Sequence, residues 1–249
     1  MLNLLRLIFL LLLIAAVVSP LILSESHDKL AIGIIDLCQD SDLIILGEKH
    51  KKPDSQELLQ AIVNEWVAEN ESVFIGLEIS RDNQAELDAA LSGGNLPEGT
   101  ISSIIDHQAY RHMIKELGRL PVTVKAIDSS AEDGNRDQGM MGHMVPLIRA
   151  DRYDKVIILV GNNHAIKSIK WHPETGHSRL GNQYLAGRLE QQGVNVCSVV
   201  QDFALNTGKP RLLPTTSQEG SHAAMHVIKA VYHDEEMSGT DVADAVVVW

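Results

Sequence analysis

Two stretches decide the expected fold: Leu43-Ile44-Ile45-Leu46-Gly47-Glu48-Lys49-His50 and Val156-Ile157-Ile158-Leu159-Val160-Gly161-Asn162-Asn163-His164. Each stretch begins with an apolar run of strand length and ends in a Gly-x-x-His segment. An unbroken aliphatic run is typical of a parallel strand that is buried on both faces. If both strands lie in one sheet, His50 and His164 meet at its carboxyl edge, where ligands bind in open α/β sheets.

Outside these stretches, further apolar runs alternate with amphipathic segments of helical spacing. This alternation predicts an α/β fold with a central, mostly parallel sheet flanked by helices and a site at the carboxyl ends of the strands. Strands are expected at 43–46, 73–79, 122–127, 156–160, 194–200 and 245–249. Helices are expected at 27–38, 55–66, 82–91, 104–117, 136–150, 184–192 and 222–232, and the tract 206–220 is expected to be irregular.

The first 24 residues are expected to be a targeting segment. Arg6 precedes an unbroken apolar run, 7–18, and Ser19-Pro20 follows it. This length fits a secretory signal better than a bilayer span, which needs about 20 apolar residues. No cleavage site is clear, so a signal peptide and an uncleaved membrane anchor both stay open. The protein is expected to be exported, periplasmic or secreted, with 25–249 as a single α/β domain.

Composition limits the partners of this chain. The 249 residues have a formal net charge of -12, with 45% hydrophobic and 22% charged residues, which is ordinary for a globular protein. A nucleic-acid binder needs a basic surface to neutralise phosphates, so no nucleic-acid partner is expected. The expected partner is a small-molecule or peptide substrate, and the sequence leaves the oligomeric state open.

The chain has two cysteines, Cys38 and Cys197. In an exported protein they could form one disulfide. Cys197 lies inside the apolar run 194–200, however, and its simpler interpretation is a small core residue. Neither cysteine has a second one nearby, so no thiolate zinc site is predicted.

Polar side chains follow the expected strands at their carboxyl ends. They are Glu48 and His50, Glu78, Asp128, His164 and, more weakly, Asp202. Two imidazoles with several carboxylates can hold a divalent ion or act as general acid and base. The candidate catalytic residues are therefore His50, Glu78, His164 and Glu48, and the first three are also the candidate metal ligands.

Glu78 is the most informative of these residues because apolar side chains flank it on both sides. A carboxylate in such a run is rarely buried without a partner. A lone histidine after a strand is usually just solvated, so His50 or His164 alone would mean little. Asp128 could instead form a turn with Ser129.

Two further features each leave alternatives open. Arg136 could simply begin a helix, or it could pair with a site carboxylate or bind an anionic substrate; Arg136 and Asp128 are the candidate substrate-binding residues. His222 and His226 share a helical face and could hold a metal, but the glutamate of a zinc-protease motif is missing. A solvated helix face is the simpler interpretation of that pair.

The order of these motifs resembles a known superfamily. Its elements here are Leu-Gly-Glu-Lys-His at 46–50, Gly-Leu-Glu at 76–78, Ile-Asp-Ser at 127–129, Arg-Asp at 136–137 and Gly-Asn-Asn-His at 161–164. The grouping joins erythromycin esterases, ChaN-like haem-binding proteins and TraB/TIKI-type proteins. The form Gly-Glu-Lys-His, followed by Lys51-Lys52-Pro53-Asp54, looks closest to the ChaN-like branch.

The resemblance implies roles for particular residues. TIKI-type relatives are implicated in metal-dependent proteolysis through residues that map onto His50, Glu78 and His164. In erythromycin-esterase relatives a histidine that corresponds to His50 is thought to activate water. ChaN-like relatives are exported or outer-membrane associated and bind haem, for which Tyr184 is the candidate ligand. The implied cofactor is thus a divalent metal ion or haem.

Three functions follow from these observations. The preferred one is an exported hydrolase that acts on an ester or amide through the His/Glu cluster, with or without a metal ion. The first alternative is a haem- or metal-binding protein without turnover, and the second is a non-catalytic interaction domain. The cluster favours the hydrolase over the interaction domain, because a domain without a ligand has no use for convergent, desolvated charges. The hydrolase and the haem- or metal-binding protein differ in the cofactor they would bind.

Overall fold

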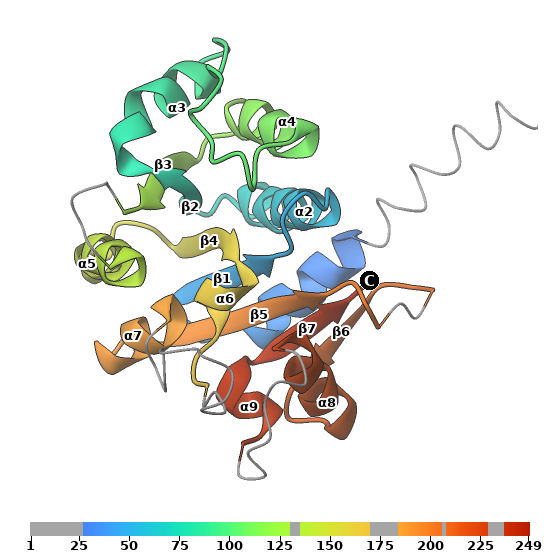
Figure 1. Ribbon diagram of the computed structural model, residues 1–249. Helices are drawn as coiled ribbons and strands as arrows, with labels where there is room; N and C mark the ends of the chain where they lie inside the picture. The colour runs from blue at the N-terminus through green and yellow to red at the C-terminus, as the bar shows by residue number, and fades with distance from the viewer. Residues whose placement is uncertain (1–26, 130–134, 170–183, 206–207, 229–236) are drawn as a thin grey trace, which may run out of the picture.

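The computed structural model describes residues 27–129, 135–169, 184–205, 208–228 and 237–249. Seven strands of this described part form one sheet in the order β3-β2-β4-β1-β5-β7-β6 (Figure 1). They are β1 (Leu43–Glu48), β2 (Val73–Ser80), β3 (Thr123–Asp128), β4 (Lys155–Gly161), β5 (Val196–Asp202), β6 (Arg211–Pro214) and β7 (Ala245–Val248). β6 pairs antiparallel with β7 and the other pairings are parallel, so the predicted α/β fold is confirmed.

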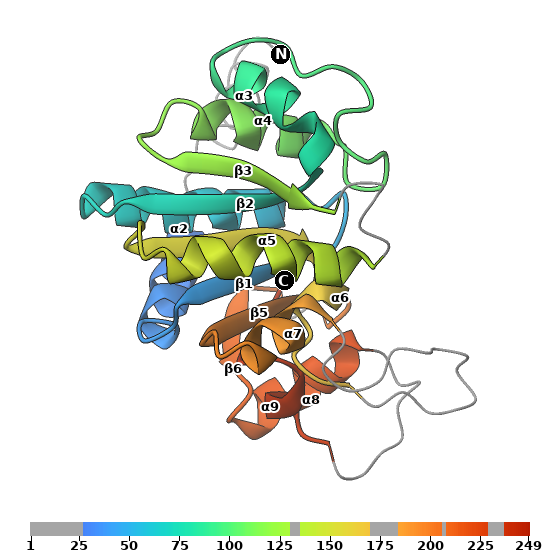
Figure 2. The same cartoon turned by 90° about the vertical axis from the view of Figure 1, so that its left-hand side faces the viewer.

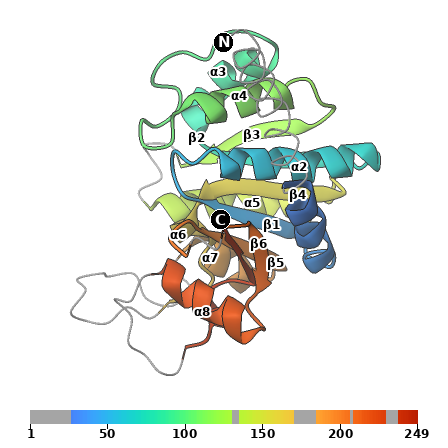
Figure 3. The same ribbon diagram turned by 90° about the vertical axis from the view of Figure 1, so that its right-hand side faces the viewer.

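Helices cover both faces of the sheet. α5 (Arg136–Arg149) and α7 (Leu185–Gln191) lie on the face turned to the viewer in Figure 2. The helix at 27–37 and α2 (Asp54–Ala68) lie on the opposite face, seen in Figure 3. The other helical segments are η1 (Arg81–Asn83), α3 (Gln84–Leu91), α4 (Gln108–Leu117), α6 (Asn162–Ala165), α8 (Gln218–Val227) and α9 (Gly239–Val242).

The central strands are buried on both sides, which explains their unbroken apolar sequences. Alternate side chains of β1 enter different cores: Ile44 and Leu46 pack with α2, whereas Leu43 and Ile45 pack with α5 and α7. A strand between two helical layers needs apolar residues on both faces. The continuous run 43–46 is therefore a direct consequence of the layered architecture.

The strand register places the two Gly-x-x-His segments side by side. In the parallel pair of β1 and β4, Gly47 lies opposite Val160 and Glu48 lies opposite Gly161. Gly47 permits this close approach, because a Cβ atom there would lie 2.5 Å from Oδ1 of Asn162. Both segments leave the same edge of the sheet on adjacent strands.

Three expected element boundaries are wrong. The tract 206–220 contains β6, a short edge strand whose sequence lacks the apolar alternation that would have identified it. α4 begins at Gln108 rather than at 104, because His107 has an extended backbone. α8 begins at Gln218 rather than at 222, because the Ser217 hydroxyl accepts a hydrogen bond from the Gly220 N–H and caps the helix.

The interpretation of Cys197 as a plain core residue is also wrong. Cys38 and Cys197 form a disulfide across 159 residues of sequence, with a Cα–Cα distance of 5.5 Å. Cys197 lies on β5, and Cys38 directly follows the helix at 27–37 that packs against this sheet face. Only the packing of that helix brings the two thiols together, and sequence spacing does not reveal it.

The expected signal peptide or anchor, 1–24, lies outside the described residues. Within the described part of the chain, every helix is too short or too polar to span a bilayer.

Candidate active site

The end of β1 positions the first histidine. Glu48 is buried, and its Oε1 lies 2.9 Å from Nδ1 of His50. Gln56, in the first turn of α2, donates its Nε2–H to the other carboxylate oxygen of Glu48 at 2.5 Å. The bond from Glu48 is the main reason that the pKa of His50 is raised above its usual value, although burial of the ring opposes this shift.

A second histidine is held in the same way. Nδ1 of His164 lies 2.5 Å from Oδ1 of Asp137, which is fully buried. His164 lies in the short α6 directly after β4, and Asp137 is the second residue of α5. Each imidazole is therefore fixed through Nδ1 by a buried carboxylate, which leaves Nε2 for other contacts.

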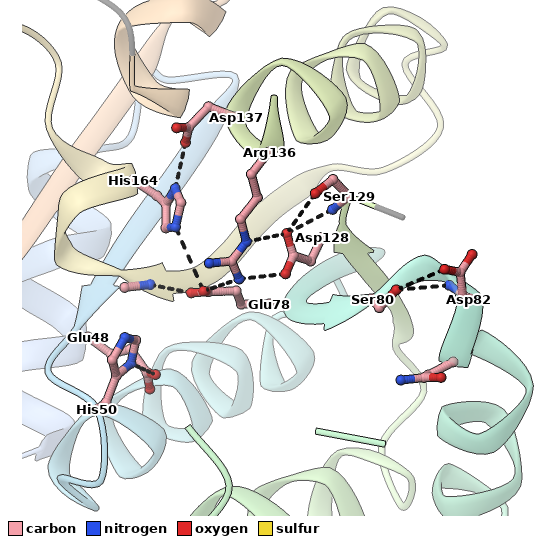
Figure 4. A network of polar contacts seen from close by, with 12 residues as sticks. Glu48, His50, Glu78, Ser80, Asp82, Asp128, Ser129, Arg136, Asp137 and His164 are labelled. Carbon is pink, nitrogen blue, oxygen red and sulfur yellow. Dashed lines mark hydrogen bonds and ion pairs between the residues drawn. The ribbon is translucent and has the colours of Figure 1, made fainter. Parts of the chain in front are cut away.

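Glu78 occupies the centre of the site (Figure 4). Its Oε1 accepts a hydrogen bond from Nη2 of Arg136 at 2.5 Å, and its Oε2 accepts one from the Gly161 N–H at 2.5 Å. Asp128 binds the same guanidinium through Nε at 2.7 Å and Nη2 at 2.5 Å. The Asp128 bonds are the main reason that the pKa of Arg136 is raised, so this residue is a permanent cation in the site.

The three residues predicted to converge lie around one small space. Nε2 of His164 is 3.7 Å from Oε1 of Glu78. A Cβ atom on Gly161 would lie 2.9 Å from Cε1 of His50 and 3.6 Å from Oε2 of Glu78. Gly161 thus keeps open the gap between His50 and Glu78, and the predicted meeting of His50, Glu78 and His164 is what the structure contains.

A cavity of about 520 Å³ opens over these residues. Its polar lining includes Glu48, Lys49, His50, Glu78, Arg136, Asn162, Asn163, His164, Gln201, Asp202 and His226, and its apolar lining includes Phe203, Ala204 and Val227. The predicted site residues therefore face one ligand-sized space, except Asp128, which lies behind Arg136 and holds it.

A side-chain bracket fixes the spacing between the two histidine segments. Asn162 donates Nδ2–H to the Gln201 carbonyl at 2.8 Å, and its Oδ1 accepts from the Gln201 N–H at 3.0 Å. Nε2 of Gln201 in turn donates to the Gly47 carbonyl at 2.6 Å. The ends of β4, β5 and β1 are tied together by this bracket, directly beneath the cavity.

The predicted divalent-metal site does not fit this arrangement. Both carboxylate oxygens of Glu78 are already bound by donors, and one of these donors is the cationic Arg136. A divalent ion next to Glu78 would meet the guanidinium charge. Accordingly, the described residues contain no group of three or more His, Cys, Asp or Glu side chains that could hold a metal ion.

The side chains that line the cavity suit haem iron better than a divalent ion, although the predicted ligand Tyr184 is not among them. Tyr184 is only 7% exposed and packs in the core beside Leu185, so it does not line the cavity. The imidazoles of His50 and His226 do line it, and imidazole is an ordinary axial ligand of haem iron.

Sequence reasoning missed several residues that complete the site. Asp137 was noted only as part of the Arg-Asp motif, and nothing in the sequence linked it to His164. Gln56 was indistinguishable from any polar residue of an amphipathic helix. Asp202 was noted only weakly, and His226 was favoured as solvated, yet Asp202 binds Nδ1 of His226 at the cavity. Asp202 could have been found from its position, because it is the last residue of β5, the strand that pairs with β1.

Comparison with known proteins supports the resemblance seen in the motifs. The family model described as haem-binding uptake, Tiki superfamily, ChaN matches residues 34–120. This segment includes Glu48, His50 and Glu78. No curated protein matches the chain significantly.

Three solved structures share the fold over most of the chain. A ChaN of Campylobacter jejuni, described with cofacial haem binding, is 12% identical with a TM-score of 0.51, and 87% of this chain and 90% of that chain are covered. An erythromycin esterase mutant in its open conformation is 10% identical with a TM-score of 0.55, and 86% of this chain and 91% of that chain are covered. A Bacillus cereus protein is 10% identical with a TM-score of 0.59, and 86% of this chain and 89% of that chain are covered.

These matches confirm the predicted resemblance to the superfamily. The family model describes haem-binding ChaN proteins of the Tiki superfamily, and the erythromycin esterase is similar to this chain in fold. At such low identities the solved structures establish the fold, and the chemistry must be derived from the site itself.

Proposed function

We propose that this protein is a metal-independent hydrolase of an ester or amide. The observation that supports this proposal is the pair of imidazoles, each fixed through Nδ1 by a buried carboxylate and both next to the Glu78–Arg136 ion pair. Such an arrangement supplies a base, an acid and a fixed positive charge in one cavity. Ester and amide hydrolysis requires these three functions.

His50 acts as the general base in this proposal. Its side chain is 36% exposed, so water can reach Nε2, whereas Glu48 fixes the ring and stabilises the imidazolium that forms. The raised pKa of His50 makes the neutral ring a stronger base. His50 takes a proton from water as the oxygen attacks the acyl carbon.

Arg136 and His164 stabilise the charges that this attack creates. Within the described residues, the Nη1 group of Arg136 has no acceptor, so it can donate to the carbonyl oxygen as negative charge develops there. His164, only 11% exposed and paired with Asp137, donates a proton to the leaving oxygen or nitrogen. The acid and the alcohol or amine are released, and the site returns to its starting state when the proton that His50 gained passes through water to His164, which has lost one.

The test uses the full chain, purified in mild detergent, with p-nitrophenyl acetate and a panel of alkyl esters. We expect turnover that survives chelation by EDTA and is lost in Glu78→Gln and His50→Ala. Turnover that depends on an added divalent ion would contradict the metal-independent mechanism. Equal rates in wild type and both variants would contradict the catalytic assignment.

Haem binding is the second candidate function. The family match supports it, and so does a feature of this cavity: an imidazole that donates Nδ1–H to a carboxylate is typical of a metal-ligating histidine. His50, the more exposed ring of the site pair, would ligate the iron. Titration with haemin would then give a stoichiometric Soret band that is lost in His50→Ala, whereas a hydrolase without haem would give none.

We further propose that the protein is exported, as its amino-terminal sequence indicates. The Cys38–Cys197 disulfide supports this proposal because such bonds persist in oxidising compartments and are rare in the cytosol. Thiol labelling of the protein in its native host, before and after reduction, tests it. Two free thiols in freshly lysed cells would contradict export.

A further inference from the structure

A third carboxylate–imidazole pair lies in the same cavity, at the end of β5. Nδ1 of His226, on α8, is hydrogen bonded to Oδ2 of Asp202. The His226 side chain is 42% exposed and lines the cavity, whereas the Asp202 side chain is 4% exposed. A buried carboxylate therefore fixes an accessible ring, as Glu48 fixes His50.

This pair is not needed for the proposed bond cleavage. His50, His164 and Arg136 already supply the base, the acid and the oxyanion donor, and each of them lies next to Glu78. His226 comes from α8, which packs against β5, β7 and β6, whereas β4 and β1 separate these strands from β2, which carries Glu78. An accessible imidazole that faces the cavity away from the reacting bond is placed to contact another part of the substrate.

The surroundings of Asp202 determine what His226 can bind. Oδ1 of Asp202 accepts hydrogen bonds from the N–H groups of Ala204 at 2.7 Å and Leu205 at 3.3 Å, so the carboxylate is fixed. Its Oδ2 keeps the proton of the neutral imidazole on Nδ1, because a carboxylate only accepts. Nε2 of His226 is then an acceptor that faces the cavity.

We propose that His226 is a specificity residue that accepts a hydrogen bond from a hydroxyl group of the substrate, away from the scissile bond. This inference rests on the proposed hydrolase function and adds a substrate class, hydroxylated esters. A keto oxygen at the same place offers no proton and turns its lone pairs toward that of Nε2. The site therefore distinguishes a hydroxyl group from the corresponding ketone.

The test compares ethyl esters of 3-hydroxy, 6-hydroxy and 8-hydroxy acids with their deoxy and oxo analogues in a pH-stat, again with the full chain. The series scans the unknown spacing between the scissile bond and the hydroxyl group. At one chain length, we expect kcat/KM of the hydroxy ester to exceed that of both analogues about 10-fold, as one hydrogen bond allows.

Two variants separate recognition from catalysis. His226→Phe should hydrolyse the hydroxy, oxo and deoxy esters with similar kcat/KM, because the hydrogen-bond acceptor that distinguishes them is gone. In Asp202→Asn, Oδ1 stays with the N–H groups of Ala204 and Leu205, so the amide donates to Nδ1 and the ring proton moves to Nε2. Nε2 then donates, and the preference for hydroxy over oxo esters should be lost. If His226→Phe does not fold, Asp202→Asn alone decides the question.

His222→Phe is the matched control, because His222 is exposed one turn earlier on the same helix and does not line the cavity. It should retain the wild-type preference. If wild type hydrolyses the esters but shows no hydroxy preference at any chain length, or if His226→Phe keeps that preference, the inference about His226 is wrong and the hydrolase proposal stands. If wild type hydrolyses none of the esters, the hydrolase proposal fails and the inference fails with it.

Discussion

The two ends of the sheet use polar side chains in opposite ways. At the amino ends of β2 and β4, the Asp154 carboxylate accepts from the backbone N–H of Ser72 at 2.8 Å and from its hydroxyl at 2.5 Å, and the Asp154 N–H donates back to that hydroxyl at 3.0 Å. These contacts are exposed and satisfy one another. At the carboxyl ends, the carboxylates of Glu48 and Asp137 are buried, and each holds one histidine through its Nδ1 atom.

This difference separates structural polar groups from functional ones. At the amino edge, Ser72 and Asp154 hydrogen bond to each other and join two loops, so their polar groups have a structural role. A pair at the carboxyl edge leaves a second imidazole nitrogen next to a cavity, at the cost of burying a charge. Buried charged pairs that keep a hydrogen-bonding atom directed at a cavity are typical of functional sites.

The largest expected difference between the two ends is in turnover. His50→Ala should lower kcat by about 1,000-fold, the usual contribution of a general base, and leave the melting temperature nearly unchanged. Asp154→Ala, its matched control at the amino edge, should lower the melting temperature and leave kcat within twofold. Ester assays and thermal melts on both variants check this, and a large loss of kcat in Asp154→Ala would break the distinction.

A smaller loss is expected from Gly161→Ala. The added methyl group would lie 2.9 Å from Cε1 of His50, closer than real Cβ contacts, so the ring must move away from Glu78. We expect kcat to fall about 100-fold, as displacement of a catalytic group by an ångström can cause. Gly142→Ala, a glycine with open space around it, is the control and should be active. Wild-type turnover in Gly161→Ala would show that His50 need not lie there.

The smallest effect is expected from Glu48→Gln, and it appears in the pH profile. Only neutral His50 can take a proton, and Glu48 raises its pKa, so the acidic limb of kcat/KM in wild type should lie above pH 6.5. Removing the charge lowers that pKa, and the limb should move to lower pH while the plateau falls about 10-fold. A limb that stays in place would mean that another group controls the rate.

Many of the residues at the carboxyl edge of the sheet could be predicted from the sequence, because each of them follows or ends a recognisable apolar strand. The apolar runs before Gly47 and Gly161 identified β1 and β4, and Glu78 within an apolar run required a buried partner. These patterns are local, and they place side chains at an edge without any knowledge of strand order.

Partners that come from other elements could not be predicted. Asp137 binds His164 only because α5 returns along β4, and Cys38 reaches Cys197 only because the helix at 27–37 packs beneath β5. The partner of Glu78 was equally hidden: residue types alone suggested a ligand for an ion, whereas in the fold Glu78 is hydrogen bonded to the Arg136 cation.

A double-mutant cycle on His50 and His164, followed through kcat/KM for the best ester of the panel, tests most directly whether the two anchored imidazoles act together. Residues that act as one unit give strongly non-additive losses. We predict that His50→Ala/His164→Ala is no more than about threefold slower than the slower single variant. Losses that multiply, or a His164→Ala variant with wild-type turnover, would show that the two histidines do not serve one reaction.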